Sequence, residues 1–257
     1  MPKIKYLFPS KLVEGTIISR PNRFIMVVDV DGQTQECHCP STGRIGSIRF
    51  EGIPCLLSKS NDEKRKTKYT VEAFSLDLPA CKTKHWIGIN QGKANAYVEF
   101  FLMAGMMKEL TGPIKSVRRE VKLGDSRVDF LINGRDYLEV KTPLKDIHCE
   151  GHPRYQKSTA KFLSFERLIK HFSDVSSSIE NGSRAIFLMC YLYDAPPFEV
   201  PVPDVQEVRI VEAAHAAAVK GVENWQANLH IDENGVEFIR YFNLHLFDSL
   251  AHGRISK

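Results

Sequence analysis

Short runs of β-branched, aromatic and polar residues, broken by turn-forming residues, fill about the first 85 positions of the chain. Such runs are typical of strands joined by tight turns. They lie at 15–19, 23–30, 34–39, 47–50, 53–58 and 69–74. About five short strands in a segment of this size favour a small closed barrel, of which the OB-like barrel is a common type. We therefore predict an OB-like barrel over residues 1–85.

Helical and strand-like segments alternate in the remainder of the chain. An apolar segment over 95–110 predicts a buried helix, with Asn95 as its N-cap and Gly112-Pro113 as its stop. Further helices are predicted at 160–172 and 210–220, and strands at 116–123, 126–132, 137–141, 184–192, 225–231 and 236–242. This order predicts a mixed α/β domain over 86–257, and hence a two-domain protein of the α/β (α+β) class.

The composition of the 257 residues, 26% charged and 43% hydrophobic, is that of a globular protein. No apolar run approaches the ~18 residues of a membrane span, and the N-terminal stretch lacks the apolar core of a signal peptide. We therefore expect no membrane contact. Six cysteines are too few for a disulfide framework. These features predict a cytoplasmic location.

Two cysteines and a histidine stand together in Cys37-His38-Cys39. Thiolates and imidazoles are the usual zinc ligands, but a tetrahedral zinc site needs four of them, and no second closely spaced pair follows. The sequence therefore favours buried thiols in a strand over a zinc site.

Positive charge is concentrated in the first three quarters of the chain. Residues 1–193 contain thirty Lys and Arg against twenty-one Asp and Glu, which favours contact with a polyanion. A polar hairpin tip at 59–68, next to Tyr69, carries five of these bases, namely Lys59, Lys64, Arg65, Lys66 and Lys68. Basic groups with an aromatic neighbour on a small barrel suit a groove that follows a nucleic-acid backbone. An ordinary solvated loop is the alternative interpretation.

Three further arginines are assigned to the same role. Arg20 and Arg23 lie at the first predicted turn of the barrel, and Arg127 lies on a strand of the second domain. With Lys64, Arg65, Lys66 and Lys68, they form the predicted set of phosphate contacts. The expected partner is DNA, or alternatively RNA.

The most informative pattern in the chain combines Asp129, Glu139 and Lys141. Both acids lie in largely apolar strands, where a carboxylate is unfavourable unless a base or a metal meets it. Oxygen ligands suit Mg²⁺ or Mn²⁺, and a lysine two residues after the glutamate can compensate charge on a phosphate. A solvated strand face is the alternative. Within residues 96–107 of the apolar helix, Glu99 is the only charge, so we consider it a third metal ligand or half of a salt bridge.

The turn at Asn133-Gly134 provides a strict test of this site. A two-residue hairpin loop would place Asp129 opposite Leu138, and period-two alternation would send Glu139 to the other side of the sheet. A three-residue loop or an equivalent bulge brings the two acids together. We therefore predict an odd-length connection with the Asp129 and Glu139 carboxylates close to each other and Glu99 reaching them from the helix.

The sequence also resembles the sugar fermentation stimulation protein A (SfsA) family over about residues 12–245. The matching stretches lie at 20–24, 38–43, 58–69, 88–90, 119–132, 138–141, 184–188 and 210–222. The resemblance implies an OB-like domain joined to a PD-(D/E)XK nuclease-like domain, with DNA binding and nuclease action. Asp129, Glu139 and Lys141 match the family motif, and Glu99 matches its helix acid. The stretch at 151–161 departs from the family pattern, so Gln156, Lys157 and Lys161 are weaker candidates for phosphate contacts.

The leading hypothesis from the sequence is a DNA-binding protein with a Mg²⁺-dependent nuclease site. Asp129, Glu139 and Lys141 would be catalytic, and Glu99, Asp129 and Glu139 would hold Mg²⁺ or Mn²⁺. The alternative is a transcriptional regulator that keeps the nuclease fold without catalysis. A sugar-linked enzyme has no support in the residues, because no nucleotide-binding glycine-rich loop is present.

Overall fold

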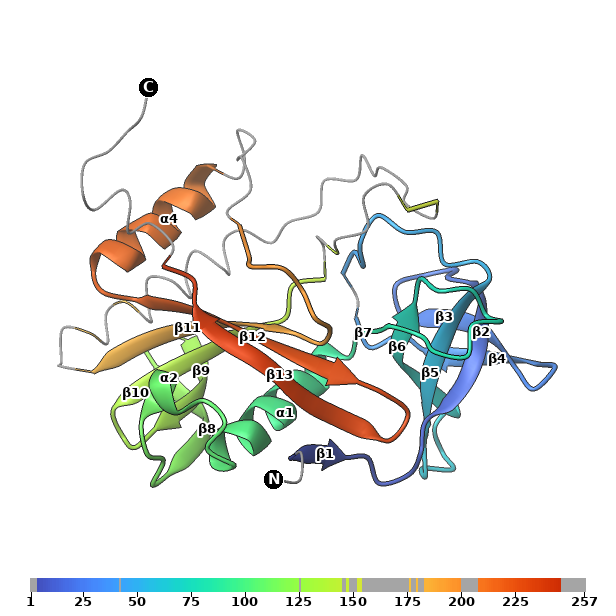
Figure 1. The fold of residues 1–257 in the computed structure, drawn as a ribbon, viewed down its shortest axis with the longest axis horizontal. Coiled ribbons are helices and arrows are strands. Elements are labelled where there is room, and N and C mark those ends of the chain that lie inside the picture. Colours follow the sequence, from blue (N-terminus) through green and yellow to red (C-terminus); the bar gives the residue numbers. More distant parts are fainter. Residues whose placement is uncertain are drawn as a thin grey trace.

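The structure is a computed structural model that describes residues 4–41, 43–124, 126–144, 147, 152–153, 176, 179, 183–199 and 208–245, the last range without side chains at 208–211. It contains two β-sheets, shown side by side in Figure 1. The predicted helix at 160–172 and the residues Gln156, Lys157 and Lys161 lie outside the described residues.

Five strands form a closed barrel in the N-terminal part of the chain. They are β2 (Val13–Ser19), β3 (Ile25–Val30), β4 (Gln33–His38), β5 (Ile53–Lys59) and β6 (Tyr69–Ser75). Their order is β4-β3-β2-β5-β6, and a parallel pairing of β4 with β6 closes the barrel. This closure confirms the predicted OB-like architecture. A sixth strand, β7 (Trp86–Gly88), extends the sheet beyond β6.

The barrel core is apolar, and it includes a residue from a segment that the sequence predicts as a strand but that forms a loop. Alternate residues of β3, namely Met26, Val28 and Val30, point inward and are buried. Residues 47–50, predicted as a strand, form only an isolated bridge, although Phe50 is buried in the core against Phe74. A loop that buries an apolar side chain shows the same local pattern as a short strand.

The second sheet has seven strands in the order β1-β13-β12-β11-β10-β9-β8. They are β1 (Lys5–Leu7), β8 (Val117–Leu123), β9 (Ser126–Ile132), β10 (Asp136–Lys141), β11 (Arg184–Tyr191), β12 (Glu223–Ile231) and β13 (Gly235–Asn243). β10, β11 and β12 are parallel, and the other pairings are antiparallel. β1 precedes the barrel in the chain but pairs with β13, so the first described strand belongs to this sheet.

Helices lie on both sides of the second sheet (Figure 1). α1 (Gln91–Met103) buries Tyr97, Phe101 and Leu102 in the cluster that also contains Phe130 and Leu138. α4 (Val208–Val219) packs through its alanines against a different cluster, which contains Phe187. Apolar residues on two faces therefore hold the sheet between helices. In the described parts of the chain, no helix combines the length and apolarity needed to cross a membrane.

The predicted helix at 95–110 differs from the structure at both ends. α1 begins at Gln91, four residues before Asn95, so Asn95 lies inside the helix and is not its N-cap. The chain then leaves the helix at Ala104, turns at Gly105 with φ 71°, and forms the short α2 (Lys108–Thr111). The left-handed conformation at Gly105 is one that glycine adopts without steric cost, which explains the break.

Candidate functional site

A three-residue connection joins β9 to β10. Ile132 pairs with Asp136 and Phe130 with Leu138, which leaves Asn133, Gly134 and Arg135 in the loop. Asn133 and Gly134 have φ values of 54° and 67°, and the Asn133 carboxamide accepts the Lys115 N–H at 2.7 Å. The predicted odd-length connection is therefore confirmed, and it sets the register on which the candidate site depends.

β9 and β10 separate just beyond their paired residues, and side-chain carboxylates replace the main-chain hydrogen-bond partners there. The last β9–β10 pair is Phe130 with Leu138. Beyond it, the Asp129 N–H points to Glu139 Oε2 at 3.4 Å, and the Val140 N–H donates to Asp129 Oδ2 at 2.8 Å. On its other edge β10 stays paired with β11. This fork, which we define by Asp129, Glu139 and Lys141, brings both acids together.

Two further side chains hold these acids in place. The Lys141 ammonium lies 2.5 Å from Glu139 Oε1, and the Asn95 carboxamide on α1 donates to Asp129 Oδ1 at 2.7 Å. Both oxygens of Asp129 are therefore engaged. Sequence reasoning missed Asn95, although its spacing of four residues from Glu99 places the two on one helix face.

The electrostatics of the fork favour a cation. Burial raises the pKa of Asp129, and the adjacent Glu139 carboxylate raises it further. The Val140 N–H, Asn95 and Lys141 act in the opposite direction. Two acids against one ammonium leave excess negative charge when both are ionised, and Glu139 is only 2% exposed. Mg²⁺ is commonly held by one or two carboxylates together with water and phosphate oxygens, so Asp129 and Glu139 fit such an ion.

Glu99 lies on α1 and pairs with an arginine. Its carboxylate accepts a charge-assisted hydrogen bond from Arg119 on β8, and its side chain is 31% exposed. The salt bridge was the alternative interpretation in the sequence, and it is the one that the structure contains. Among the described residues, no group of three or more His, Cys, Asp or Glu is arranged to hold a metal.

The cysteines of the Cys37-His38-Cys39 stretch are both buried in the barrel core. Burial raises the pKa of the Cys37 thiol to about 11 and also raises the pKa of Cys39. Thiols with raised pKa values are poor zinc ligands, because the metal binds the thiolate. This matches the expectation of buried thiols in a strand.

The predicted phosphate contacts of the barrel lie on two loops. Arg20 and Arg23 belong to the β2–β3 loop, whereas Lys64, Arg65, Lys66 and Lys68 belong to the β5–β6 loop. In OB folds these are the loops between the first two and the last two strands, which flank the oligonucleotide-binding face. The three lysines are exposed, and the Arg65 guanidinium donates to Thr70 Oγ1 at 2.8 Å.

The arginines of the predicted set differ in the contacts that their guanidinium groups make. One guanidinium nitrogen of Arg20 donates to the carbonyls of Ser41 at 2.9 Å and Gly43 at 3.1 Å, so Arg20 holds the protein's own backbone. Arg23 is exposed and lies over the Phe24 ring. Arg127 is also exposed, with a loose 3.5 Å contact to Glu120.

A chain of side-chain contacts connects the β2–β3 loop to the fork. Ser41, which Arg20 contacts, bonds through its hydroxyl to Gln91 Oε1 at 3.2 Å. The same Gln91 carboxamide donates to the Thr142 carbonyl at 2.7 Å, and Thr142 directly follows Lys141. The loop that carries Arg20 and Arg23 is therefore close to the end of β10 that carries the fork.

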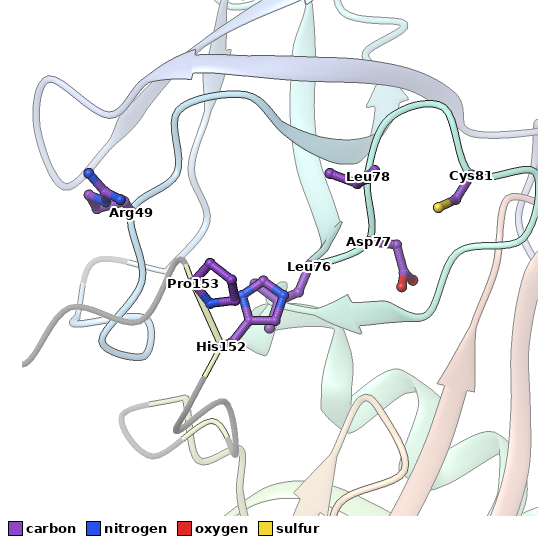
Figure 2. Close-up of a pocket in the computed structure, with 7 residues that line it drawn as sticks. All are labelled: Arg49, Leu76, Asp77, Leu78, Cys81, His152 and Pro153. Carbon is purple, nitrogen blue, oxygen red and sulfur yellow. The ribbon is translucent and has the colours of Figure 1, made fainter.

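A separate hollow of about 610 Å³ lies on the barrel side of the molecule (Figure 2). It is lined by Arg49, Leu76, Asp77, Leu78, Cys81, His152 and Pro153. His152 follows β10 in the chain, and none of the predicted site residues lines this hollow. The hollow is therefore distinct from the fork.

Comparison with known proteins identifies the family. A model described as the SfsA N-terminal OB domain matches residues 18–89, and a model described as the sugar fermentation stimulation protein RE domain matches residues 92–235. The chain belongs to the SfsA family. Sugar fermentation stimulation protein homologs from Maricaulis maris and Pseudoalteromonas atlantica are each 32% identical to it. The matches cover 84% and 80% of this chain, and 88% and 81% of the relatives.

A solved structure shows the same fold. It is SfsA of Pyrococcus furiosus in complex with Ca²⁺, with a TM-score of 0.72 and 20% sequence identity. The match covers 93% of this chain and 98% of the Pyrococcus protein. Both sheets described above therefore belong to the family architecture.

Proposed function

We propose that this SfsA family member is a Mg²⁺- or Mn²⁺-dependent nuclease that hydrolyses phosphodiester bonds in DNA or RNA. The observation that carries the proposal is the fork, where Asp129 and Glu139 replace main-chain partners between separating strands and Lys141 contacts Glu139. Two acids paired with only one lysine at a break in a sheet leave an uncompensated negative charge, which is unfavourable away from water unless a cation binds.

Asp129 and Glu139 would hold the divalent cation, and Asn95 keeps the Asp129 carboxylate oriented toward the fork. A bound Mg²⁺ would supply a Lewis acid and a water of lowered pKa. Lys141 holds a positive charge beside Glu139, where it can compensate charge on the phosphate that undergoes attack. Glu99 lies one helical turn beyond Asn95 and would become a third ligand by exchanging Arg119 for the cation.

The Pyrococcus relative supports a divalent ion, because its structure is described as a complex with Ca²⁺. Ca²⁺ and Mg²⁺ both take oxygen ligands, although Mg²⁺ demands stricter geometry. A site built from two carboxylates suits either ion. We extend this property to the present chain on the strength of the fork.

The barrel would supply the nucleic-acid contacts. The exposed Lys64, Lys66 and Lys68 lie on one flanking loop, and Arg23 lies on the other. The contacts through Ser41, Gln91 and Thr142 bring the β2–β3 loop near Lys141. A nucleic-acid strand held by the barrel would therefore approach the fork.

A catalytically silent DNA-binding regulator is the second candidate function. The observation that favours it is the ion pair of Glu99 with Arg119, which leaves two carboxylates at the fork. A protein that needs only the shape of the nuclease fold would tolerate such a pairing.

Cleavage assays distinguish the two functions. Purified chain is incubated with supercoiled DNA, single-stranded DNA and RNA in Mg²⁺, Mn²⁺ or EDTA. We expect cleavage with either metal and none in EDTA. Asp129→Asn and Glu139→Gln should lose cleavage but retain binding, whereas the control Glu233→Gln, a partly exposed acid paired with Lys11, should cleave normally. Binding without cleavage by the wild-type chain would favour the regulator, and cleavage by Asp129→Asn would refute the assigned site.

A further inference from the structure

Three elements of the barrel meet at one end of its nucleic-acid face. His38, at the end of β4, is paired with Ile25 on β3 and with Thr70 on β6. The end of β4 is tied to the β2–β3 loop, because the Cys39 N–H donates to the Phe24 carbonyl at 2.7 Å. Arg65 reaches the same place from the β5–β6 loop through its 2.8 Å bond to Thr70. We define Arg23, Phe24, His38 and Arg65 as the loop-end cluster.

The loop-end cluster exposes flat groups to solvent. Phe24 is 45% exposed, although a phenyl ring is normally buried in a protein of this size. The Arg23 guanidinium lies over that ring, 4.6 Å from its centroid. Aromatic rings and guanidinium planes are the surfaces on which unpaired bases stack in proteins that bind single strands.

The state of His38 agrees with this arrangement. Burial lowers the pKa of its imidazole, and the nearby Arg65 charge lowers it further. An uncharged imidazole near neutral pH leaves the positive charge of the cluster to Arg23 and Arg65. The loop-end cluster therefore combines two uncharged rings, those of Phe24 and His38, with the cations of Arg23 and Arg65.

Acidic residues limit how far along the face a polyanion can extend. On the outward side of the same strands, Glu36 is paired with Val27, and Asp29 with Thr34. These carboxylates lie further from the β2–β3 loop than the pair of Ile25 with His38. Their charge repels phosphates, so we expect an unpaired base to be held nearer the β2–β3 loop.

We propose that the barrel binds single-stranded nucleic acid, with an unpaired base stacked on Phe24 and its flanking phosphates held by Arg65 and the lysines of the β5–β6 loop. This inference rests on the proposed function and names its substrate class. Bases inside a duplex already stack on one another and cannot reach a protein ring without being extruded. A duplex can therefore use the cations of the barrel but not Phe24.

The test is a binding measurement in EDTA, so that cleavage plays no part. A fluorescent oligonucleotide of about 16 nucleotides, the upper site size of one OB barrel, is titrated as a single strand and as its blunt duplex. The wild-type chain should bind the single strand more tightly at equal salt. Phe24→Ala should weaken single-strand binding about 5-fold or more, without changing duplex binding or the salt dependence.

Two variants serve as controls. Leu78→Ala removes another exposed apolar side chain outside the cluster and should change neither affinity. Phe24→Trp keeps a stacking surface and should bind the single strand at least as tightly as the wild type. Thermal melting establishes that each variant is folded, and the partial exposure of Phe24 makes its replacement compatible with folding.

The outcomes separate this inference from the proposed function. Equal wild-type binding to single strand and duplex, or equal behaviour of Phe24→Ala and Leu78→Ala, would overturn the stacking site while leaving a nuclease in place. A wild-type chain that binds neither nucleic acid would contradict the proposed function, and the inference would fall with it. Selective loss of single-strand binding in Phe24→Ala, restored in Phe24→Trp, would establish the stacking site.

Discussion

The carboxamide of Asn95, inside α1, donates a 2.7 Å hydrogen bond to Oδ1 of Asp129 on β9. The other oxygen of Asp129 accepts the Val140 N–H at 2.8 Å. A helix and a neighbouring strand therefore fix one carboxylate from two directions. This arrangement orients Asp129 before any ligand arrives, which reduces the entropy that binding must overcome.

Asn95→Ala should weaken both the fold and the affinity of the fork for metal. Removal of a hydrogen bond to a charged group costs about 1.5–3 kcal/mol when the group is buried, and the lower end applies here because Asn95 is only partly buried. Differential scanning fluorimetry should show a lower Tm and a smaller rise on addition of Mg²⁺. Thr34→Ala, on the exposed side of β4, should show the same rise in Tm on addition of Mg²⁺ as the wild type. An unchanged Mg²⁺ response in Asn95→Ala would remove Asn95 from the site.

Asp129→Asn should stabilise the metal-free protein at neutral pH. Burial, and then the Glu139 charge, raise the folded pKa of Asp129 above its unfolded value. The resulting contribution to stability is fully present below the unfolded pKa and is lost as pH rises through the folded pKa. The Tm of the variant relative to the wild type should therefore increase between about pH 4 and pH 7 in EDTA.

Magnesium should reverse the order of stability of the wild type and Asp129→Asn. An ion that binds only the folded protein raises its apparent stability, so Mg²⁺ should raise the Tm of the wild type but not that of Asp129→Asn. A wild-type Tm that does not respond to Mg²⁺ or Mn²⁺, with no difference between the proteins across the pH range, would count against a metal at the fork.

Neutralising the β5–β6 loop should reduce the salt dependence of nucleic-acid binding. If Lys64, Lys66 and Lys68 each contact a phosphate, replacing all three by Gln should lower the slope of log affinity against log salt by about two to three. The control replaces Lys11, Lys82 and Lys108 by Gln, which removes the same charge from exposed positions elsewhere. Anisotropy titrations at several salt concentrations measure both slopes. Equal slopes for the two triple variants would mean that only net charge matters.

Local patterns in the sequence were sufficient to predict much of the architecture. The register of β9 and β10 was predictable because side chains alternate with a period of two, and only an odd-length loop allows Asp129 and Glu139 to meet. Five strands of the barrel followed from short apolar runs and turn residues, because each strand buries alternate side chains in one core.

Features that depend on distant parts of the chain were not predictable in this way. β1 pairs with β13, more than two hundred residues away, and no local pattern in Lys5–Leu7 specifies that partner. Asn95 resembles an N-cap by residue type, yet the helix begins earlier and the Asn95 side chain is satisfied by Asp129. The sequence alone is compatible with either a metal or an arginine as the partner of Glu99, because each compensates the charge of an acid on an apolar helix.

The ion pair of Glu99 with Arg119 leads to the last prediction, which concerns competition for one carboxylate. If Glu99 is a third ligand, a cation at the fork must displace Arg119, and the loss of that ion pair weakens metal binding. Arg119→Gln should therefore bind Mn²⁺ more tightly than the wild type, whereas Glu99→Gln should bind it more weakly. The exposed pair contributes little to stability, so both variants should remain folded. Isothermal titration with Mn²⁺ measures the affinities, and Arg118→Gln, an exposed neighbour on the same strand, controls for the loss of positive charge.

If Arg119→Gln and Arg118→Gln tighten binding equally, the gain is a general charge effect. If Glu99→Gln also binds like the wild type, Glu99 is part of a salt bridge only and the fork holds its metal with two carboxylates.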